Sequence, residues 1–133
     1  MSTIDARIIR ALTPILGVRN IYASVTSDDL PKDNEGQFIP FCIFSSAGGE
    51  VLQCLERIYD RGKSNWKMEI STFAPRAETA RALAKKVETA ILESEEFLAV
   101  RVLGNCQDDV DWAMKLYSCS QTFDLWAENP KGT

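Results

Sequence analysis

Two groups of side chains in this 133-residue chain are of types that do chemistry: the acids Asp108, Asp109 and Asp111, and four cysteines. Paired carboxylates such as Asp108 and Asp111 could perform acid–base work on a small ligand. The chain has no histidine, however, and so lacks the usual general base near neutral pH. No residue at a characteristic sequence spacing from these acids could act as their catalytic partner. We therefore expect no catalytic residue, no cofactor and no enzyme activity.

The acids of residues 108–111 also suggest a metal site. A calcium loop requires the spacing Asp-x-Asp-x-Asp-Gly with a later Glu, and this segment lacks that spacing. We interpret the segment as a solvated acidic turn that binds no metal.

The four cysteines, Cys42, Cys54, Cys106 and Cys119, are dispersed along the chain. None belongs to a Cys-x-x-Cys pair, so zinc would have to be held by four scattered thiolates. Cys42 lies within an apolar run and Cys119 within an alternating one, which is typical of cysteines that pack as small hydrophobic residues. We predict that the cysteines are reduced, structural and free of metal.

The composition narrows the class of protein. The chain carries a net charge of −4 at pH 7, whereas a protein that binds duplex nucleic acid needs a basic surface to displace counterions. No apolar run approaches the ~18 residues that a membrane-spanning helix requires. The first residues, Met1 to Asp5, lack the basic and apolar regions of a signal peptide. We expect a single domain over residues 1–133, made in the cytoplasm, that binds neither membranes nor specific nucleic-acid sequences.

The clearest secondary-structure signal is a change of hydrophobic period between Trp66 and Ile91. From Trp66 to Ala74 apolar and polar side chains alternate, which predicts a strand with one buried face. Pro75 ends that strand and suits the first turn of a helix. From Ala77 to Leu92 the apolar residues recur at helical spacing, so we predict a long amphipathic helix there.

A second amphipathic helix is predicted over residues 2–16. Pro14 is unfavourable inside a helix and predicts an end or a kink near Leu12, and Gly17 predicts the C-terminal stop. The remaining apolar segments are predicted to be extended: Val18 to Val25, Phe38 to Ser46, Phe97 to Leu103 and Ala113 to Trp126.

Residues 26–37 form a polar, acidic connection. Its acids are opposed by the single Lys32, and at twelve residues it is long enough that it usually has a function or is disordered. Two interpretations remain open: recognition of a basic partner, and a merely solvated connection. The acids of this loop are Asp28, Asp29, Asp33 and Glu35.

Residues 50–61 are ambiguous between helix and strand, and we favour an extended arm. Apolar and charged side chains lie beside one another there, which would suit a subunit interface with a polar rim. Besides Lys32 and the loop acids, the candidate interface residues are Glu50, Val51, Leu52, Leu55, Arg57, Tyr59, Arg61 and Lys63.

The order of these elements and the placement of several aromatic residues resemble a known family. An N-terminal helix is followed by Val-x-x-Ile-Tyr at 18–22, the polar loop with Leu30-Pro31, and a Pro-aromatic strand beginning at Pro40. An alternating strand, an Ala-rich helix and a closing Tyr-x5-Phe-x-Leu-Trp at 117–126 complete the pattern. This pattern covers nearly the whole chain and is similar to the tail-completion, or tail-terminator, proteins of long-tailed bacteriophages.

The resemblance implies an α+β fold: an antiparallel sheet of about four strands packed by two helices, with long polar loops. It also implies a structural virion protein that is not an enzyme. Such proteins form a ring, commonly of six subunits, that caps the finished tail tube and presents a surface to the head connector. The expected partners are other copies of the chain, the tail tube protein and the head-connector protein. The expected location is the tail, at the head–tail interface of the virion.

Two other functions remain open. A single-stranded nucleic-acid-binding α+β module would use Trp66 and Phe73 as stacking platforms. These residues have opposite parity on one strand, however, and so lie on different sheet faces unless a bulge intervenes. A small-ligand enzyme would use Asp108 and Asp111, for which no partner is evident.

Overall fold

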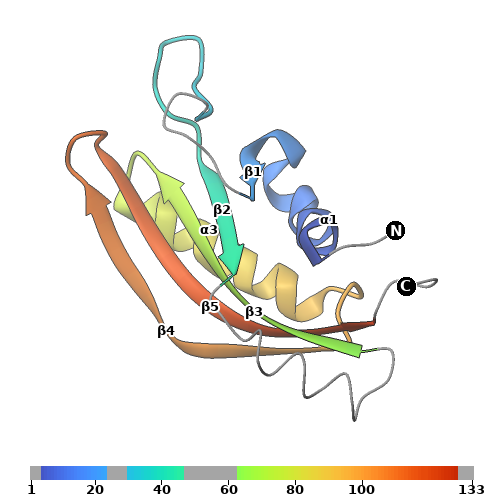
Figure 1. Cartoon of the computed structure of the whole chain (residues 1–133). Helices are drawn as coiled ribbons and strands as arrows, with labels where there is room; N and C mark the ends of the chain where they lie inside the picture. Colours follow the sequence, from blue (N-terminus) through green and yellow to red (C-terminus); the bar gives the residue numbers. More distant parts are fainter. Residues whose placement is uncertain (1–3, 24–29, 47–62, 129–133) are drawn as a thin grey trace.

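The computed structural model describes residues 4–23, 30–46 and 63–128. In these ranges two α-helices, one short 3₁₀ helix and five strands follow one another along the chain (Figure 1). The elements are α1 (Ile4–Leu16), η1 (Val18–Asn20), β1 (Ile21–Tyr22), β2 (Phe41–Ser46), β3 (Lys63–Ala74), α3 (Ala77–Glu93), β4 (Ala99–Asp111) and β5 (Leu116–Glu128).

The five strands form one sheet in the order β1-β2-β3-β5-β4. Strand β1 lies parallel to β2, and all other neighbours are antiparallel. The predicted α+β class is therefore confirmed, but the described sheet has five strands rather than about four. Residues 18–25 were predicted to be extended, whereas a turn of 3₁₀ helix at 18–20 precedes the two residues of β1. Two residues are too few to give a period-two signal in the sequence.

Both α-helices pack on the same face of the curved sheet, with α3 running along it and α1 beside α3 (Figure 1). Successive side chains of a strand point to opposite faces, so alternate residues form the buried layer. On β3 and β5 these buried residues are Met68, Ile70, Thr72 and Ala74, and Cys119, Gln121, Phe123, Leu125 and Ala127. The alternation predicted for both strands is thus confirmed.

The helices contribute a matching apolar stripe. Ile8 and Leu12 of α1 and Val87 and Ile91 of α3 join the sheet residues in one hydrophobic cluster. Their spacing of four residues places each pair on one face of its helix. The predicted helix boundary near Leu92 differs from the observed end of α3 by one residue. No described helix is both long and apolar enough to cross a membrane.

Helix α1 continues through Pro14 to Leu16, so the expectation that it could end near Leu12 was wrong. Proline removes only one helical hydrogen bond at this position, and the final turn is held because Leu16 packs against the hydrophobic cluster. Gly17 ends the helix as predicted. Its φ of 79° suits glycine, and its amide donates to the Thr13 carbonyl at 2.9 Å.

Candidate functional site

The described part of the acidic loop is a small folded hairpin that we call the 30–39 hairpin. Lys32 and Phe38 pair as an antiparallel bridge, and the Ile39 amide donates to the Pro31 carbonyl at 3.0 Å. The Lys32 ammonium lies 5.0 Å from the centroid of the Phe38 ring, a cation–π distance. This part of the loop is therefore not a structureless connection.

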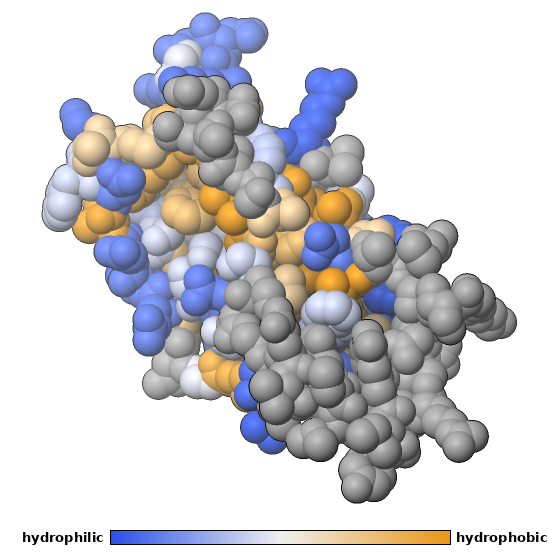
Figure 2. Space-filling view, in the orientation of Figure 1, coloured by the Kyte–Doolittle hydropathy of each residue, from blue (hydrophilic) through white to orange (hydrophobic). Residues whose placement is uncertain are grey.

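Asp33 organises the tip of the 30–39 hairpin. Its Oδ1 accepts hydrogen bonds from the amides of Glu35 and Gln37, both at 2.9 Å, and its own amide donates to the Gln37 carbonyl at 2.8 Å. Gly36 supplies the positive φ of 80° that the turn requires. The hairpin projects beyond the end of the sheet (Figure 1), and hydrophilic residues cover it (Figure 2).

Only a few of the candidate interface residues can be placed. Lys32, Asp33 and Glu35 are exposed on the 30–39 hairpin, and Lys63 begins β3, where its backbone pairs with Glu128 of β5. The remaining candidates lie outside the described residues: Asp28, Asp29, Glu50, Val51, Leu52, Leu55, Arg57, Tyr59 and Arg61.

The acids Asp108, Asp109 and Asp111 lie on strand β4, not in a turn as predicted. Asp108 pairs with Arg81 of α3, Oδ2 to Nε, at 3.0 Å. Asp108 and Asp111 are three residues apart on a regularly paired part of the strand, so their side chains point to opposite faces. They do not form the carboxylate pair that an acid–base site would need.

The turn follows these acids, at residues 112–115 between β4 and β5. Asp111 Oδ1 accepts a hydrogen bond from the Met114 amide at 3.1 Å, and Lys115 adopts a φ of 55°. Trp112 stands on this tip with 76% of its surface exposed. It contributes to a hollow of about 360 Å³ with Ala77 and Arg81 at the start of α3.

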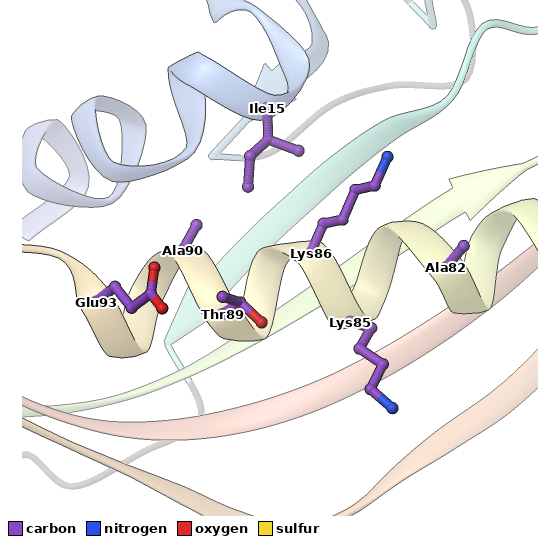
Figure 3. Close-up of a pocket in the computed structure, with 7 residues that line it drawn as sticks. All are labelled: Ile15, Ala82, Lys85, Lys86, Thr89, Ala90 and Glu93. Carbon is purple, nitrogen blue, oxygen red and sulfur yellow. The ribbon is translucent and has the colours of Figure 1, made fainter.

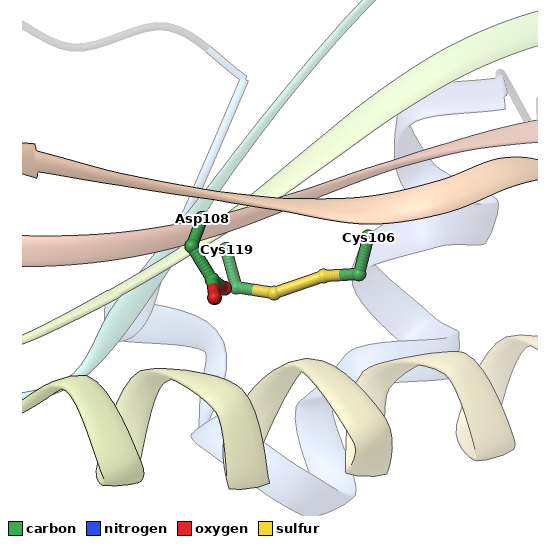
Figure 4. Close-up of side chains that lie close together, drawn as sticks. All are labelled: Cys106, Asp108 and Cys119. Carbon is green, nitrogen blue, oxygen red and sulfur yellow. A yellow bond between two sulfur atoms is a disulfide. The ribbon is translucent and has the colours of Figure 1, made fainter.

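Cys106 and Cys119 form a disulfide that joins β4 to β5 (Figure 4). The prediction of reduced cysteines was therefore wrong for this pair. The two lie 13 residues apart in the sequence, and only the pairing of the strands brings them together. The Asp108 carboxylate lies within 4.8 Å of the sulfurs. Because the sulfurs are bonded to each other, neither is a thiolate that could hold a metal here.

Strand β4 is an edge of the sheet, and it carries a β-bulge beside the disulfide. The pairing register shifts between Leu103 and Gln107, and Gly104 has a φ of 72°. The side chain of Gln121, which is buried, donates to the carbonyls of Leu103 and Gly104, each at 3.2 Å. A bulge disturbs the row of edge groups that another strand would need, so this edge is poorly suited to strand addition.

Cys42 is a buried free thiol in β2, as the sequence predicted. Burial raises the pKa of this thiol to about 12. It therefore stays protonated near pH 7 and is not a nucleophile. Cys54 lies outside the described residues.

The aromatic residues proposed as stacking platforms do not share a face. Trp66 packs against the hydrophobic cluster on the helix side. Phe73 lies on the other face, where it stacks on the buried Phe41 with ring centroids 4.9 Å apart and planes 8° apart. Tyr22 meets the same Phe41 ring edge-on at 6.1 Å. These contacts serve packing within the sheet and remove the main physical support for a nucleic-acid-binding module.

A groove of about 590 Å³ lies between α1 and α3 (Figure 3). Ile15 of α1 and Ala82 and Ala90 of α3 supply its apolar lining. Lys86 extends toward the α1 side of α3, whereas Lys85 extends to the opposite side (Figure 3). Neither lysine forms an ion pair with any described residue. The sequence predicted an amphipathic helix here, but it could not predict that α1 would pack beside that helix and form a groove.

Glu96, in the connection from α3 to β4, binds α1. Arg10 Nε donates to Glu96 Oε1 at 2.7 Å, and Arg7 Nη1 donates to the Glu96 main-chain carbonyl at 2.6 Å. The hydrogen bond from Arg10 lowers the pKa of the Glu96 carboxyl below its ordinary value. This contact joins α1 to the segment that follows α3.

Comparison with solved structures adds a finding on the fold. The chain is similar to a chain of the structure titled "Virion of native gene transfer agent (GTA) particle", with a TM-score of 0.57 over 95% of each chain and 15% sequence identity. The two chains share a fold. No protein-family model matches the sequence, and no curated protein matches it.

Proposed function

We propose that this chain is a structural virion protein of a tailed-phage type of particle and that it acts as a tail terminator. The observation that carries the proposal is the shared fold with a chain of a virion particle over 95% of both chains. The order of helix, strand and aromatic elements in the sequence, which resembles tail-terminator proteins, supports the finer role. The protein is not an enzyme in this proposal, and it needs no cofactor or metal.

The protein in this proposal is a single domain over residues 1–133 and assembles as a ring of six copies. The ring caps the finished tail tube on one side and meets the head connector on the other. It is made in the host cytoplasm and resides in the tail, at the head–tail interface of the virion. Residues 50–61 contribute to the contacts of the ring, because apolar and charged side chains occur together there.

The 30–39 hairpin contributes attachment to the tail tube or the connector. It projects beyond the sheet, and Asp33 and Glu35 are exposed at its tip. Exposed carboxylates attract a basic partner surface and are screened by salt. Attachment should therefore weaken as the ionic strength rises.

Complementation of tail-deficient particles tests this proposal. Particles made without the gene should carry tails of irregular length or tails without heads, and added wild-type protein should restore infectious particles. Replacing Asp28, Asp29, Asp33 and Glu35 by Asn or Gln should weaken rescue without unfolding the protein, because Asn at position 33 keeps the acceptor oxygen of the hairpin. Normal particles without the gene would contradict the tail role. Full rescue by the neutralised protein would make the loop a solvated connection only.

A further inference from the structure

Three large hydrophobic side chains of the described residues are exposed, and the most exposed of them lies at the tip of the β4–β5 hairpin. Trp112 is 76% exposed, compared with 50% for Leu98 and 49% for Leu92. The backbone that presents it is held in place, because the Asp111 carboxylate caps the Met114 amide. An exposed tryptophan on a fixed turn is typical of an anchor residue, since tryptophan is enriched among the residues that dominate interfaces.

The groove between α1 and α3 has the properties that such an anchor needs. Its volume of about 590 Å³ lies in the range of ~300–1,000 Å³ that is typical of sites that hold compact ligands. Ile15, Ala82 and Ala90 supply an apolar wall. Lys86, which extends toward α1, supplies a cation that can lie against an aromatic face.

The charges of the two surfaces are also complementary. The tip carries Asp109, Asp111 and Lys115, a net charge of −1, and the residues that line the groove include Lys85, Lys86 and Glu93, a net charge of +1, of which the Lys86 cation lies on the α1 side. Asp109 and Asp111 form no ion pair with any described residue, and the nearby Arg81 is paired with Asp108. Opposite charges around an apolar contact favour the correct orientation of two surfaces.

We propose that Trp112 of one copy of this chain inserts into the α1–α3 groove of a second copy. Within one copy Trp112 contributes to a different hollow, at the start of α3, so it does not fill its own groove. Two different surfaces meet in such a contact. A contact of this head-to-tail kind closes into a ring when the rotation between copies permits. The inference rests on the proposed ring and adds the contact that builds it.

Three variants of the full chain test the contact. Trp112→Ala removes the anchor. Ala82→Glu keeps a good helix former while placing a carboxylate in the groove, four residues before Lys86. Leu98→Ala is the control, because it removes an exposed apolar side chain that belongs to neither surface. Circular dichroism should show the wild-type fold in all three.

Sedimentation over a range of concentrations measures association. Loss of an interface anchor should weaken association at least ~30-fold, so Trp112→Ala and Ala82→Glu should each be monomers where the wild type and Leu98→Ala are rings. Mixing the two deficient variants should give dimers and nothing larger, because one variant retains the groove and the other retains Trp112. Native mass spectrometry would identify these dimers as one copy of each variant.

The outcomes separate the contact from the ring. A wild type that assembles together with a Trp112→Ala variant that assembles equally well would overturn the contact and leave the ring standing. Loss of attachment to tails without loss of the ring in that variant would also overturn it, since Trp112 would then dock on another protein. Two deficient variants that remain monomers when mixed would overturn it as well. A wild type that is monomeric at every concentration would overturn the proposed ring itself.

Discussion

Replacing Phe123 by alanine tests the core that positions every surface discussed above. Phe123 is 0% exposed and lies on β5, with Met68 of β3 and Val102 of β4 as its cross-strand neighbours. It belongs to the same hydrophobic cluster as residues of both helices. The alanine variant leaves a cavity where the sheet and the helices meet, and the rigid strands on either side limit its collapse.

The expected loss of stability can be estimated from this environment. A buried Phe→Ala change typically costs about 3–5 kcal/mol, the sum of the lost transfer free energy and the cavity. A chain of this length has an unfolding entropy near 0.28 kcal/mol/K, so the melting temperature should fall by roughly 10–18 °C. The loss is a large part of the ~5–15 kcal/mol that stabilises a typical domain.

Urea unfolding at equal protein concentration provides the measurement, because assembly would otherwise alter the apparent stability. Phe123→Ala should lower the midpoint without changing the m-value. Leu98→Ala, at a half-exposed site, should change the free energy of unfolding by no more than about 0.5 kcal/mol. A loss below about 1 kcal/mol for Phe123→Ala would refute the placement of β5 at the centre of the core.

Three smaller changes test individual contacts. Asp33→Ala removes the acceptor of two amide hydrogen bonds and should lower the free energy of unfolding by about 1 kcal/mol. It should also speed hydrogen exchange at the Glu35 and Gln37 amides, whereas Asp33→Asn should exchange like the wild type. Equal behaviour of both variants would contradict the capped tip. Cys106→Ser removes a disulfide with a sequence separation of 13, and the chain-entropy model predicts a loss of about 3 kcal/mol in the free energy of unfolding. Urea unfolding of the wild type in reductant should show the same loss. An unchanged urea midpoint would mean that the disulfide is absent. Glu96→Gln should destabilise the protein at pH 7, and melting curves should converge with the wild type as the pH falls below the ordinary value of 4.5 through the lowered pKa of the folded state; a difference that persists in acid would contradict an ionic contact.

Local periodicity was enough to predict much of the fold. The alternation from Trp66 to Ala74 and the helical stripe that follows it correspond to β3 and α3. Each element buries one face, and the apolar residues of that face recur with the period of the element. Gly17 marked the end of α1 because its positive φ leaves few alternatives. The parity of Trp66 and Phe73 also predicted correctly that they lie on different faces.

Features that depend on contacts between distant segments could not be predicted in this way. The Cys106–Cys119 disulfide requires the pairing of β4 with β5, and the groove beside Ala82 requires the packing of α1 on α3. The 30–39 hairpin is a different case, since Asp33 and Gly36 are typical turn residues and a closer reading of turn chemistry could have found it. The acids on β4 were predicted to lie in a turn because the segment is polar and Val110 is the single apolar residue among them that would indicate a strand.

The mass of the intact assembly tests the central claim most directly. Native mass spectrometry of the full chain should give a closed species with six times the 14.9 kDa mass of one chain. The population of that species should grow with concentration at the expense of the monomer, and no open series of larger multimers should appear. A single-chain mass that persists up to concentrations of about 100 μM, well above the Kd range of specific protein assemblies, would contradict the ring and with it the proposed role as a tail terminator.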